Sequence, residues 1–576
     1  MKNIINKILK IAFANLLIFS FANCLVSCED FLEQPASGIL AEDDLTGVEQ
    51  IENMCISAYA GIGNDEINRP LMLWNFGNVR SDDAYKGGND QNDGNWLHFL
   101  EISSDAFNSG DNWLTDVFWY RNYVVISRIN SALRALNNVS EAEMPNKTVR
   151  VAEMRFLRGH LHFIQKIVFR QIPFVTENMS PEDISNESNV KYTSDELWQK
   201  IVDDFDFAHK NLPPTQTEIG RADKYAAAAY LAKAYLYKAY RQDEAHNVTE
   251  INRVELQKVI ELADEVIASP YRLESDFAFN FLPGQYENGA EALFSVQYSQ
   301  EDGTTFGRLN IGCALTTPTP GGDFNKPSQS LVNAFITKNG LPDFNGYNTG
   351  NYNETADKAD PRLFHTVAIP GKPYKYTNLT FENSDYFTIG RNPSMYGVYS
   401  SLKENVDPQS KFYVKTGPWY ANSKNWIVLR YSDVLLFKAE ALIESGAFAD
   451  ALPLINQVRN RAKVSTGLIA FADNVDIQLY TDGVNGVSWN QDFARKALRW
   501  ERRLEMAMEG SRFFDLVRWG IADETMNAYY QKEQAAHTYY QGAVFHKNKN
   551  EYCPVPVQQI NYSKGEGLYK QNYGWN

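Results

Sequence analysis

Along several stretches of the chain, apolar residues recur every three or four positions, which is the spacing of one face of an α-helix. In the clearest stretch, Leu197, Ile201 and Phe205 follow a capping box at residues 193–196. Similar patterns predict helices at residues 48–62, 119–136, 149–169, 224–240, 256–268, 425–444, 449–462 and 494–510. The chain is therefore predicted to be mainly α-helical.

Two pairs of these helices have the spacing of tetratricopeptide units. The pair 425–444 and 449–462 places large and small residues where such a unit has them, at Leu435, Ala439, Leu442, Ala451, Ile455 and Val458. Residues 225–240 and 256–266 look like a second, degenerate copy. Because such units bury their apolar faces only by stacking on neighbours, we expect further pairs.

The middle of the chain differs from both flanks. Residues 269–427 are rich in Gly, Pro, Asn and Tyr and lack a helical period. Irregular regions of this length usually have a function, and binding residues often lie on loops that rigid helices support. We therefore predict a single domain over residues 28–576. It comprises an N-terminal helical part to residue 268, a loop-rich ligand-binding insert at 269–427 and a C-terminal helical part at 428–576.

The N-terminal residues predict export. Three lysines precede a short apolar run, which is typical of a secretory signal and too short to span a membrane. The following Leu25-Val26-Ser27-Cys28 is similar to a bacterial lipobox. We therefore predict a lipoprotein signal peptide at residues 1–27 and lipidation of Cys28. A plain signal peptide with an unmodified thiol is the alternative, and Cys24 is a poorer candidate for the lipid.

Composition narrows the choice of ligands. The formal net charge of −16 argues against nucleic acid, because phosphate binding needs a surface of Lys and Arg. Cys55, Cys313 and Cys553 are widely separated and show neither a disulfide framework nor metal-ligand spacing. The chain has 11 Trp and 32 Tyr, residues that suit partly wet contact surfaces.

Several motifs occur in a fixed order along the chain. They are Cys28-Glu29-Asp30-Phe31-Leu32, Ala58-Tyr59-Ala60-Gly61, Ala152-Glu153-Met154-Arg155-Phe156-Leu157-Arg158, Leu429-Arg430-Tyr431-Ser432-Asp433-Val434-Leu435-Leu436, Glu501-Arg502-Arg503-Leu504-Glu505, Gly510-Ser511-Arg512-Phe513-Phe514-Asp515-Leu516 and Gln571-Asn572-Tyr573-Gly574. Together they resemble the SusD/RagB family of outer-membrane nutrient-binding lipoproteins. The resemblance covers both ends and most predicted helices, and it is weak in the loop-rich middle.

The resemblance implies a mainly α fold with about four tetratricopeptide-like helix pairs and a ligand-binding face built from loops. It implies a non-enzymatic protein without cofactors, which captures a polysaccharide or oligosaccharide and delivers it to a SusC-like TonB-dependent transporter. Glu29 and Asp30 resemble an acidic tag for surface export, so the protein is expected on the cell outer membrane, lipid-anchored and facing the medium. The RagB branch of the family binds peptides, so peptide capture is the alternative function.

Two chemical alternatives compete with this interpretation. Glu505 and Glu509 could supply the two carboxylates of a glycoside hydrolase. Their helical spacing gives each an arginine neighbour, however, and a salt-bridged carboxylate loses the raised pKa that an acid catalyst needs. A structural ion-pair network is therefore predicted, and a surface glycosidase is the weaker alternative. Residues 89–95 are similar to a calcium loop, but Leu100 stands where a Glu is needed, so no metal is expected.

Carbohydrate binding needs aromatic faces for the C–H patches of the sugar and fixed polar groups for its hydroxyls. Three clusters in the predicted loops combine both: first Asp82, Asp83, Tyr85 and Trp96; then Arg391 and Tyr396; finally Trp419 and Tyr420. These residues are the predicted ligand contacts, and local packing explains each cluster equally well. Three further tryptophans lie on helical stripes or family helices and are expected in the core: Trp113, Trp119 and Trp500.

Overall fold

Helices are the main secondary structure of the chain, as the hydrophobic pattern predicts. The computed structural model describes residues 47–63, 73–108, 113–303, 308–416, 419–469, 472–563 and 567–575. The predicted signal peptide and Cys28 lie outside the described residues. Helix α3 (Val48–Gly63) begins in an N-terminal unit, Met1–Glu52, and residues Asn53–Asn576 form a second unit, which contains all the other elements.

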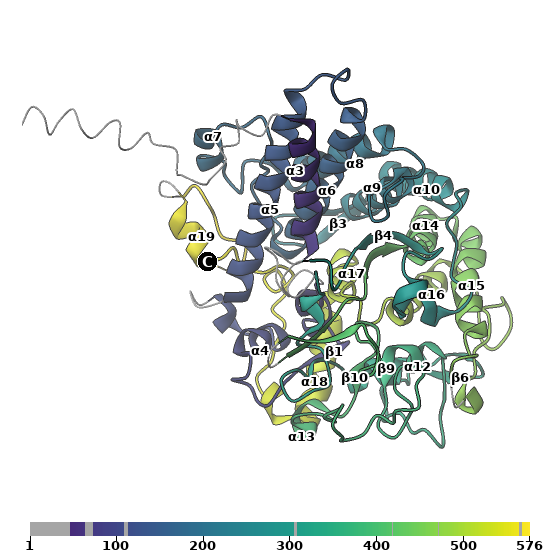
Figure 1. Ribbon diagram of the computed structural model, residues 1–576. Coiled ribbons are helices and arrows are strands. Elements are labelled where there is room, and N and C mark those ends of the chain that lie inside the picture. Colours follow the sequence, from purple (N-terminus) through teal and green to yellow (C-terminus); the bar gives the residue numbers. More distant parts are fainter. Residues whose placement is uncertain are drawn as a thin grey trace, which may run out of the picture. The chain divides into compact units, whose positions relative to one another are not determined.

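Eight long helices of this second unit pack in succession, each against the next. They are α5 (Trp113–Asn137), α6 (Lys147–Phe169), α8 (Ser194–Asn211), α9 (Lys224–Ala239), α10 (Arg253–Ile267), α14 (Tyr431–Ser445), α15 (Phe448–Val464) and α16 (Gln491–Glu505). Figure 1 shows the helices from α6 through α9 and α10 to α14 following one another. The two predicted pairs, α9 with α10 and α14 with α15, are among these contacts, and α6 packs against α8 in the same series.

Local sequence explains both the ends and the close packing of these helices. Thr193 caps α8 by accepting a hydrogen bond from the backbone N–H of Glu196, whose side chain accepts one in return from Thr193. Gly446 ends α14 with a φ of 95°, a left-handed conformation that favours glycine. In α9, the fully buried side chains of Ala228 and Ala232 leave room for α8, α10 and α14 to approach.

Two helix boundaries differ from the prediction. Residues 425–430 are not helical, because β13 (Trp426–Arg430) pairs antiparallel with β4 (Ala292–Val296). A short apolar run with β-branched residues suits a strand as well as a helix, and the distant partner decides between them. The helix expected to reach residue 510 ends at Glu505, and α17 (Arg512–Arg518) begins after a turn.

The middle of the chain is built from short elements that join distant segments. In two-stranded antiparallel sheets, β1 (Ala84–Gly87) pairs with β5 (Phe324–Pro327), and β11 (Tyr413–Thr416) pairs with β12 (Trp419–Asn422). The other α-helices and strands of the middle are α11 (Gln329–Ala334), α12 (Arg362–Thr366), α13 (Pro393–Tyr396), β6 (Ile336–Lys338), β7 (Leu341–Pro342), β8 (Lys358–Ala359), β9 (Val367–Ala368) and β10 (Ser400–Ser401). Outside the middle lie α4 (Asn95–Glu101), α7 (Pro181–Ser185), α18 (Ala522–Ala536), α19 (Val557–Tyr562), β2 (Tyr240–Gln242) and β3 (Val248–Ile251).

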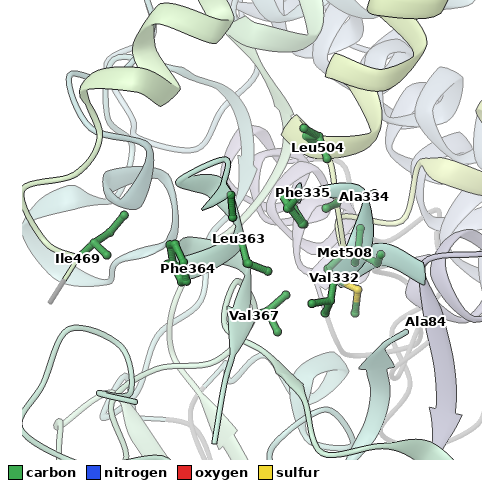
Figure 2. Packing of buried hydrophobic residues seen from close by; sticks show 13 residues of the cluster. Ala84, Val332, Ala334, Phe335, Leu363, Phe364, Val367, Ile469, Leu504 and Met508 are labelled. Atoms are coloured by element: carbon green, nitrogen blue, oxygen red, sulfur yellow. The ribbon is translucent and has the colours of Figure 1, made fainter. Parts of the chain in front are cut away.

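An apolar core fixes these short elements to the helices. Figure 2 shows side chains from α11, α12 and the end of α16 packing together, with Ala84 of β1 beside them. Phe335 and Leu363 at its centre are fully buried. The start of β1 is therefore held in place from several directions. Within the described part of the chain, no helix is both long and apolar enough to cross a membrane.

Candidate functional site

The first predicted cluster begins with two carboxylates that the structure places in the interior. Asp82 and Asp83 are 2% and 0% exposed. Arg503 of α16 pairs with both, at 2.9 Å from Asp82 Oδ2 and 2.9 Å from Asp83 Oδ1, and Arg512 adds a contact of 2.9 Å to Asp82. Burial alone would raise the pKa of Asp82, but the two guanidinium groups outweigh it and lower the pKa to about 2. These carboxylates fix the loop to the helices and do not face solvent.

The tyrosines of the first two clusters are also buried. Tyr85 is 2% exposed, and its hydroxyl donates a hydrogen bond of 3.0 Å to Glu533. Tyr396 is 1% exposed and packs on Tyr539, with ring centroids 5.2 Å apart. Asp82, Asp83, Tyr85 and Tyr396 are therefore structural in this conformation, which corrects their assignment as ligand contacts. Their partners lie on distant segments, which the local sequence cannot reveal.

A buried lysine side chain holds together the loop that resembles a calcium site. The Lys86 side chain is buried, and its Nζ donates to the carbonyl oxygens of Gly87, Asp90 and Asp93 at 2.9, 2.7 and 2.6 Å. Burial lowers the pKa of Lys86 to about 8, although nearby carboxylates oppose the shift. The ammonium group thus binds the loop carbonyls as a metal ion would. Among the described residues, no cluster of His, Cys, Asp and Glu is arranged to hold a metal.

Directly after this loop, two tryptophans form an aromatic pair at the surface, called here the tryptophan pair. Gly94 precedes α4 with a φ of 73°, Trp96 is the second residue of α4, and Trp113 is the first residue of α5. Their rings meet edge to face, with centroids 5.4 Å apart. Trp113 is 47% exposed, so its expected place in the core is wrong. Its position at a helix end, after Gly110-Asp111-Asn112, is the signal that could have revealed its exposure.

In the structure, Arg391 of the second cluster contacts the loop of residues 89–95, which leads to Trp96. Arg391 pairs with Asp93 at 2.8 Å, and the side-chain amide of Asn392 donates to the carbonyl of Asn89 at 2.7 Å. Arg391 also donates from its backbone N–H to Asp323 and from its guanidinium to the carbonyl of Gly322, at 2.6 and 3.3 Å. Part-exposed polar groups from two distant segments therefore lie beside the loop that leads to Trp96.

The third cluster lies on the β11–β12 hairpin. Tyr420 stacks on Tyr413 with ring centroids 4.7 Å apart and an angle of 7° between the planes. For Trp419, only the backbone lies within the described structure, where it pairs with Thr416. Tyr420 also lines an open cleft together with Tyr386. Of the predicted contacts, Trp96, Arg391 and Tyr420 therefore remain partly accessible.

The two carboxylates of the glycosidase alternative belong to a buried ion-pair network, as predicted. Glu505 is fully buried and contacts Arg362 at 3.2 Å, Arg430 at 2.6 Å and also Arg461. Burial would raise the pKa of Glu505, but the three guanidinium groups outweigh it and hold the pKa far below its ordinary value. A carboxyl group that stays ionised cannot donate a proton to a leaving group. These residues hold α16 to β13 and α15.

Comparisons with known proteins agree with this architecture. Residues 290–575 match the family described as "SusD family", and residues 49–236 match the one described as "Starch-binding associating with outer membrane". SusD-like protein P2 of Formosa agariphila is 26% identical over 512 residues, which cover 87% of this chain and 89% of that protein.

Solved structures show the same fold over nearly the whole chain. A SusD superfamily protein from Bacteroides vulgatus superposes with a TM-score of 0.65 at 23% identity, covering 93% of this chain and 99% of its own. A protein described as "Laminarin binding SusD-like protein" gives a TM-score of 0.66 at 20% identity, covering 92% and 100%. With family models that match both parts of the chain and relatives aligned over most of their length, the chain belongs to the SusD/RagB family, whose members are binding proteins rather than enzymes.

Proposed function

We propose that the protein captures a carbohydrate at the cell surface and binds it without cleaving it. The observation that carries the proposal is the tryptophan pair, two indole rings held at the surface next to the polar loop of residues 89–95. Indole faces pack on the C–H patches of sugar rings, and nearby amide and charged groups can bind hydroxyls. A family described as starch-binding and a structural neighbour described as laminarin-binding support carbohydrate as the ligand class.

The site is pre-organised, which favours binding. Lys86 fixes the loop from within, and Arg391 fixes it from outside through Asp93. A surface that is already ordered loses less conformational entropy when a ligand binds. Trp96 can therefore contribute binding free energy without a rearrangement of its loop.

The cellular role follows from the same family. The protein would be anchored in the outer membrane through lipidated Cys28 and would pass its ligand to a SusC-like TonB-dependent transporter. The lipobox-like sequence and the family description of outer-membrane association support this role. Replacing Cys28 with Ala should release the protein from the outer-membrane fraction of producing cells, as fractionation and immunoblotting would measure. Retention of the variant in that fraction would contradict lipid anchoring at this cysteine.

Isothermal titration against soluble starch, laminarin, xylan and pectin tests the proposed function, with a mixture of peptides as the comparison. We expect binding to at least one polysaccharide and no release of reducing ends during incubation. Binding to peptides alone would favour the RagB-like alternative. Release of reducing ends would favour a glycosidase.

A further inference from the structure

A second aromatic surface, which includes neither Trp96 nor Trp113, forms an open cleft of about 450 Å³. Its walls come from four segments: the loop 319–321, the loop that carries Asp385 and Tyr386, the turn at Pro408, and the β11–β12 hairpin, which contributes Tyr413, Lys415 and Tyr420. We call this feature the tyrosine cleft. A volume of this size is within the range of sites that enclose small ligands.

The stacked tyrosines give the cleft a preformed aromatic wall. Tyr413 and Tyr420 are diagonal neighbours in the hairpin, where Tyr413 pairs with Asn422 and Lys415 pairs with Tyr420. Diagonal side chains on one face of an antiparallel pair are close enough for aromatic contact. Next to this wall, the hairpin is held firmly, because Ala421 and Asn422 are buried and the Asn422 amide donates to the carbonyl of Glu404 at 2.9 Å.

The opposite aromatic group is also carried on a rigid base. Tyr386 is 39% exposed, whereas the adjacent Phe387 is 4% exposed and packs against Tyr374 at 4.5 Å. The backbone N–H of Thr388 donates to the carbonyl of Pro318 at 2.9 Å, which ties this segment to the loop of residues 319–321. The segment of Tyr386 and the loop 319–321 are therefore fixed relative to each other, and the ring of Tyr386 remains available.

The polar groups of the cleft indicate the class of ligand. Asp385 and Lys415 supply one negative and one positive charge, so the lining has no net charge to select an ion. The tyrosine hydroxyls add groups that donate and accept hydrogen bonds. Flat aromatic faces with a balanced set of hydrogen-bonding groups suit a neutral, hydroxyl-rich chain such as a polysaccharide.

The tyrosine cleft and the tryptophan pair share a supporting segment. Residues 319–321 line the cleft, and the adjoining Gly322 and Asp323 accept hydrogen bonds from Arg391. Arg391 also pairs with Asp93, in the loop of residues 89–95 that leads to Trp96. We propose that the tyrosine cleft is a second carbohydrate subsite, and that one extended glycan chain occupies both surfaces. The inference rests on the proposed function, and it makes the substrate a long polysaccharide rather than a short oligosaccharide.

The test compares polymer with oligomer. Affinities are measured by isothermal titration for soluble starch and laminarin, and for malto- and laminari-oligosaccharides of increasing length. Tyr386→Ala and Tyr420→Ala should each weaken binding of the polymer by about tenfold, the loss expected when an anchoring aromatic is truncated. Both variants should leave the affinity for the shortest bound oligosaccharide unchanged. Tyr386→Phe, which keeps the ring and loses only the hydroxyl, should retain most of the affinity for the polymer.

Two controls make the outcome unambiguous. Tyr562→Ala removes a tyrosine that is 77% exposed on α19 and should change nothing. Trp96→Ala should weaken polymer and oligomer alike. Unchanged polymer affinity in both Tyr386→Ala and Tyr420→Ala would overturn the second subsite and leave the proposed function intact. Unchanged binding in Trp96→Ala, with polymer affinity lost in the tyrosine variants, would instead contradict the tryptophan site and keep the cleft.

Discussion

Residues 82–85 and residues 89–96 lie close together in the chain and have similar compositions, yet the structure uses them in opposite ways. Asp82 and Asp83 are enclosed by Arg503 and Arg512, whereas Trp96 reaches the surface and meets Trp113. Residues 82–85 are buried because the arginines that pair with Asp82 and Asp83 lie more than 400 residues further along the chain and fold over them. Acidic and aromatic residues in a loop therefore do not reveal by themselves which of them face a ligand.

The contrast between the two segments also separates stability from binding. Variants in the buried segment should destabilise the folded protein, because they remove partners from an enclosed network. Variants in the exposed segment should weaken ligand binding and leave the protein folded. Four substitutions test this division: one within each segment, at Asp82 and Trp96, and one at a residue that bonds to each segment, at Glu533 and Lys86.

Asp82→Asn should have the largest effect. It leaves Arg503 and Arg512 with one carboxylate fewer in a buried network, and removal of one partner from a buried ion pair costs about 3–5 kcal/mol of unfolding free energy. Chemical denaturation followed by circular dichroism measures the loss. Asp492→Asn, at a side chain that is 94% exposed, is the matched control and should be neutral. If Asp82→Asn and Asp492→Asn had the same unfolding free energy, the segment around Asp82 would not be structural.

Lys86→Met should come next. Methionine preserves much of the side-chain length but donates no hydrogen bonds, so the carbonyls of Gly87, Asp90 and Asp93 lose their shared partner. A loss of about 2–3 kcal/mol in unfolding free energy is expected, together with weaker carbohydrate binding, because the loop before Trp96 is no longer fixed. Lys210→Met, at a side chain that is 66% exposed, is the control. Stability equal to that control would mean that Lys86 does not organise the loop.

Trp96→Ala should affect binding alone. Truncation of an anchoring aromatic weakens binding by about 1–3 kcal/mol, and the melting temperature should remain that of the parent protein. Titration calorimetry and thermal unfolding, run on the same sample, measure the two effects. A lowered melting temperature with unchanged affinity would show that Trp96 serves packing instead.

Glu533→Gln should give the smallest effect, visible as a change in pH dependence. Burial raises the pKa of Glu533 from its ordinary value of 4.5 to about 7, although the Tyr85 hydroxyl opposes the shift. The folded protein therefore binds this proton more strongly than the unfolded chain, and the stabilisation is lost as the pH rises through 7. Between about pH 5.5 and pH 8, the parent should lose about 1–2 kcal/mol more unfolding free energy than Glu533→Gln. Parallel stability curves would show that Glu533 is ionised throughout.

The fold was largely predictable from the sequence. The helices at residues 149–169, 224–240 and 256–268 follow from apolar spacing, and the structure has α6, α9 and α10 at these places with small differences at their ends. The prediction was wrong at residues 425–430, where pairing with β4 decides the conformation of β13. Pairing between strands that are far apart in the chain leaves no local pattern.

The site was less predictable. The sequence shows which aromatic and polar residues lie in loops, but Asp82, Tyr85 and Tyr396 are buried by contacts that form only in the folded protein. Trp113 was missed because its apolar character fits a helical stripe, although it begins its helix and is half-exposed. Exposure depends on which distant segment covers a residue, and one sequence does not contain that information.

The most direct test is calorimetric titration of polysaccharides into the parent protein and into a Trp96→Ala/Trp113→Ala variant, with reducing ends assayed in the same cell afterwards. The indole rings should supply the main contact, so the parent should bind at least one polysaccharide, release no reducing ends, and lose most of its affinity in the double variant. Undiminished affinity in a folded double variant, or cleavage of the bound chain, would contradict a non-catalytic carbohydrate site at these two tryptophans.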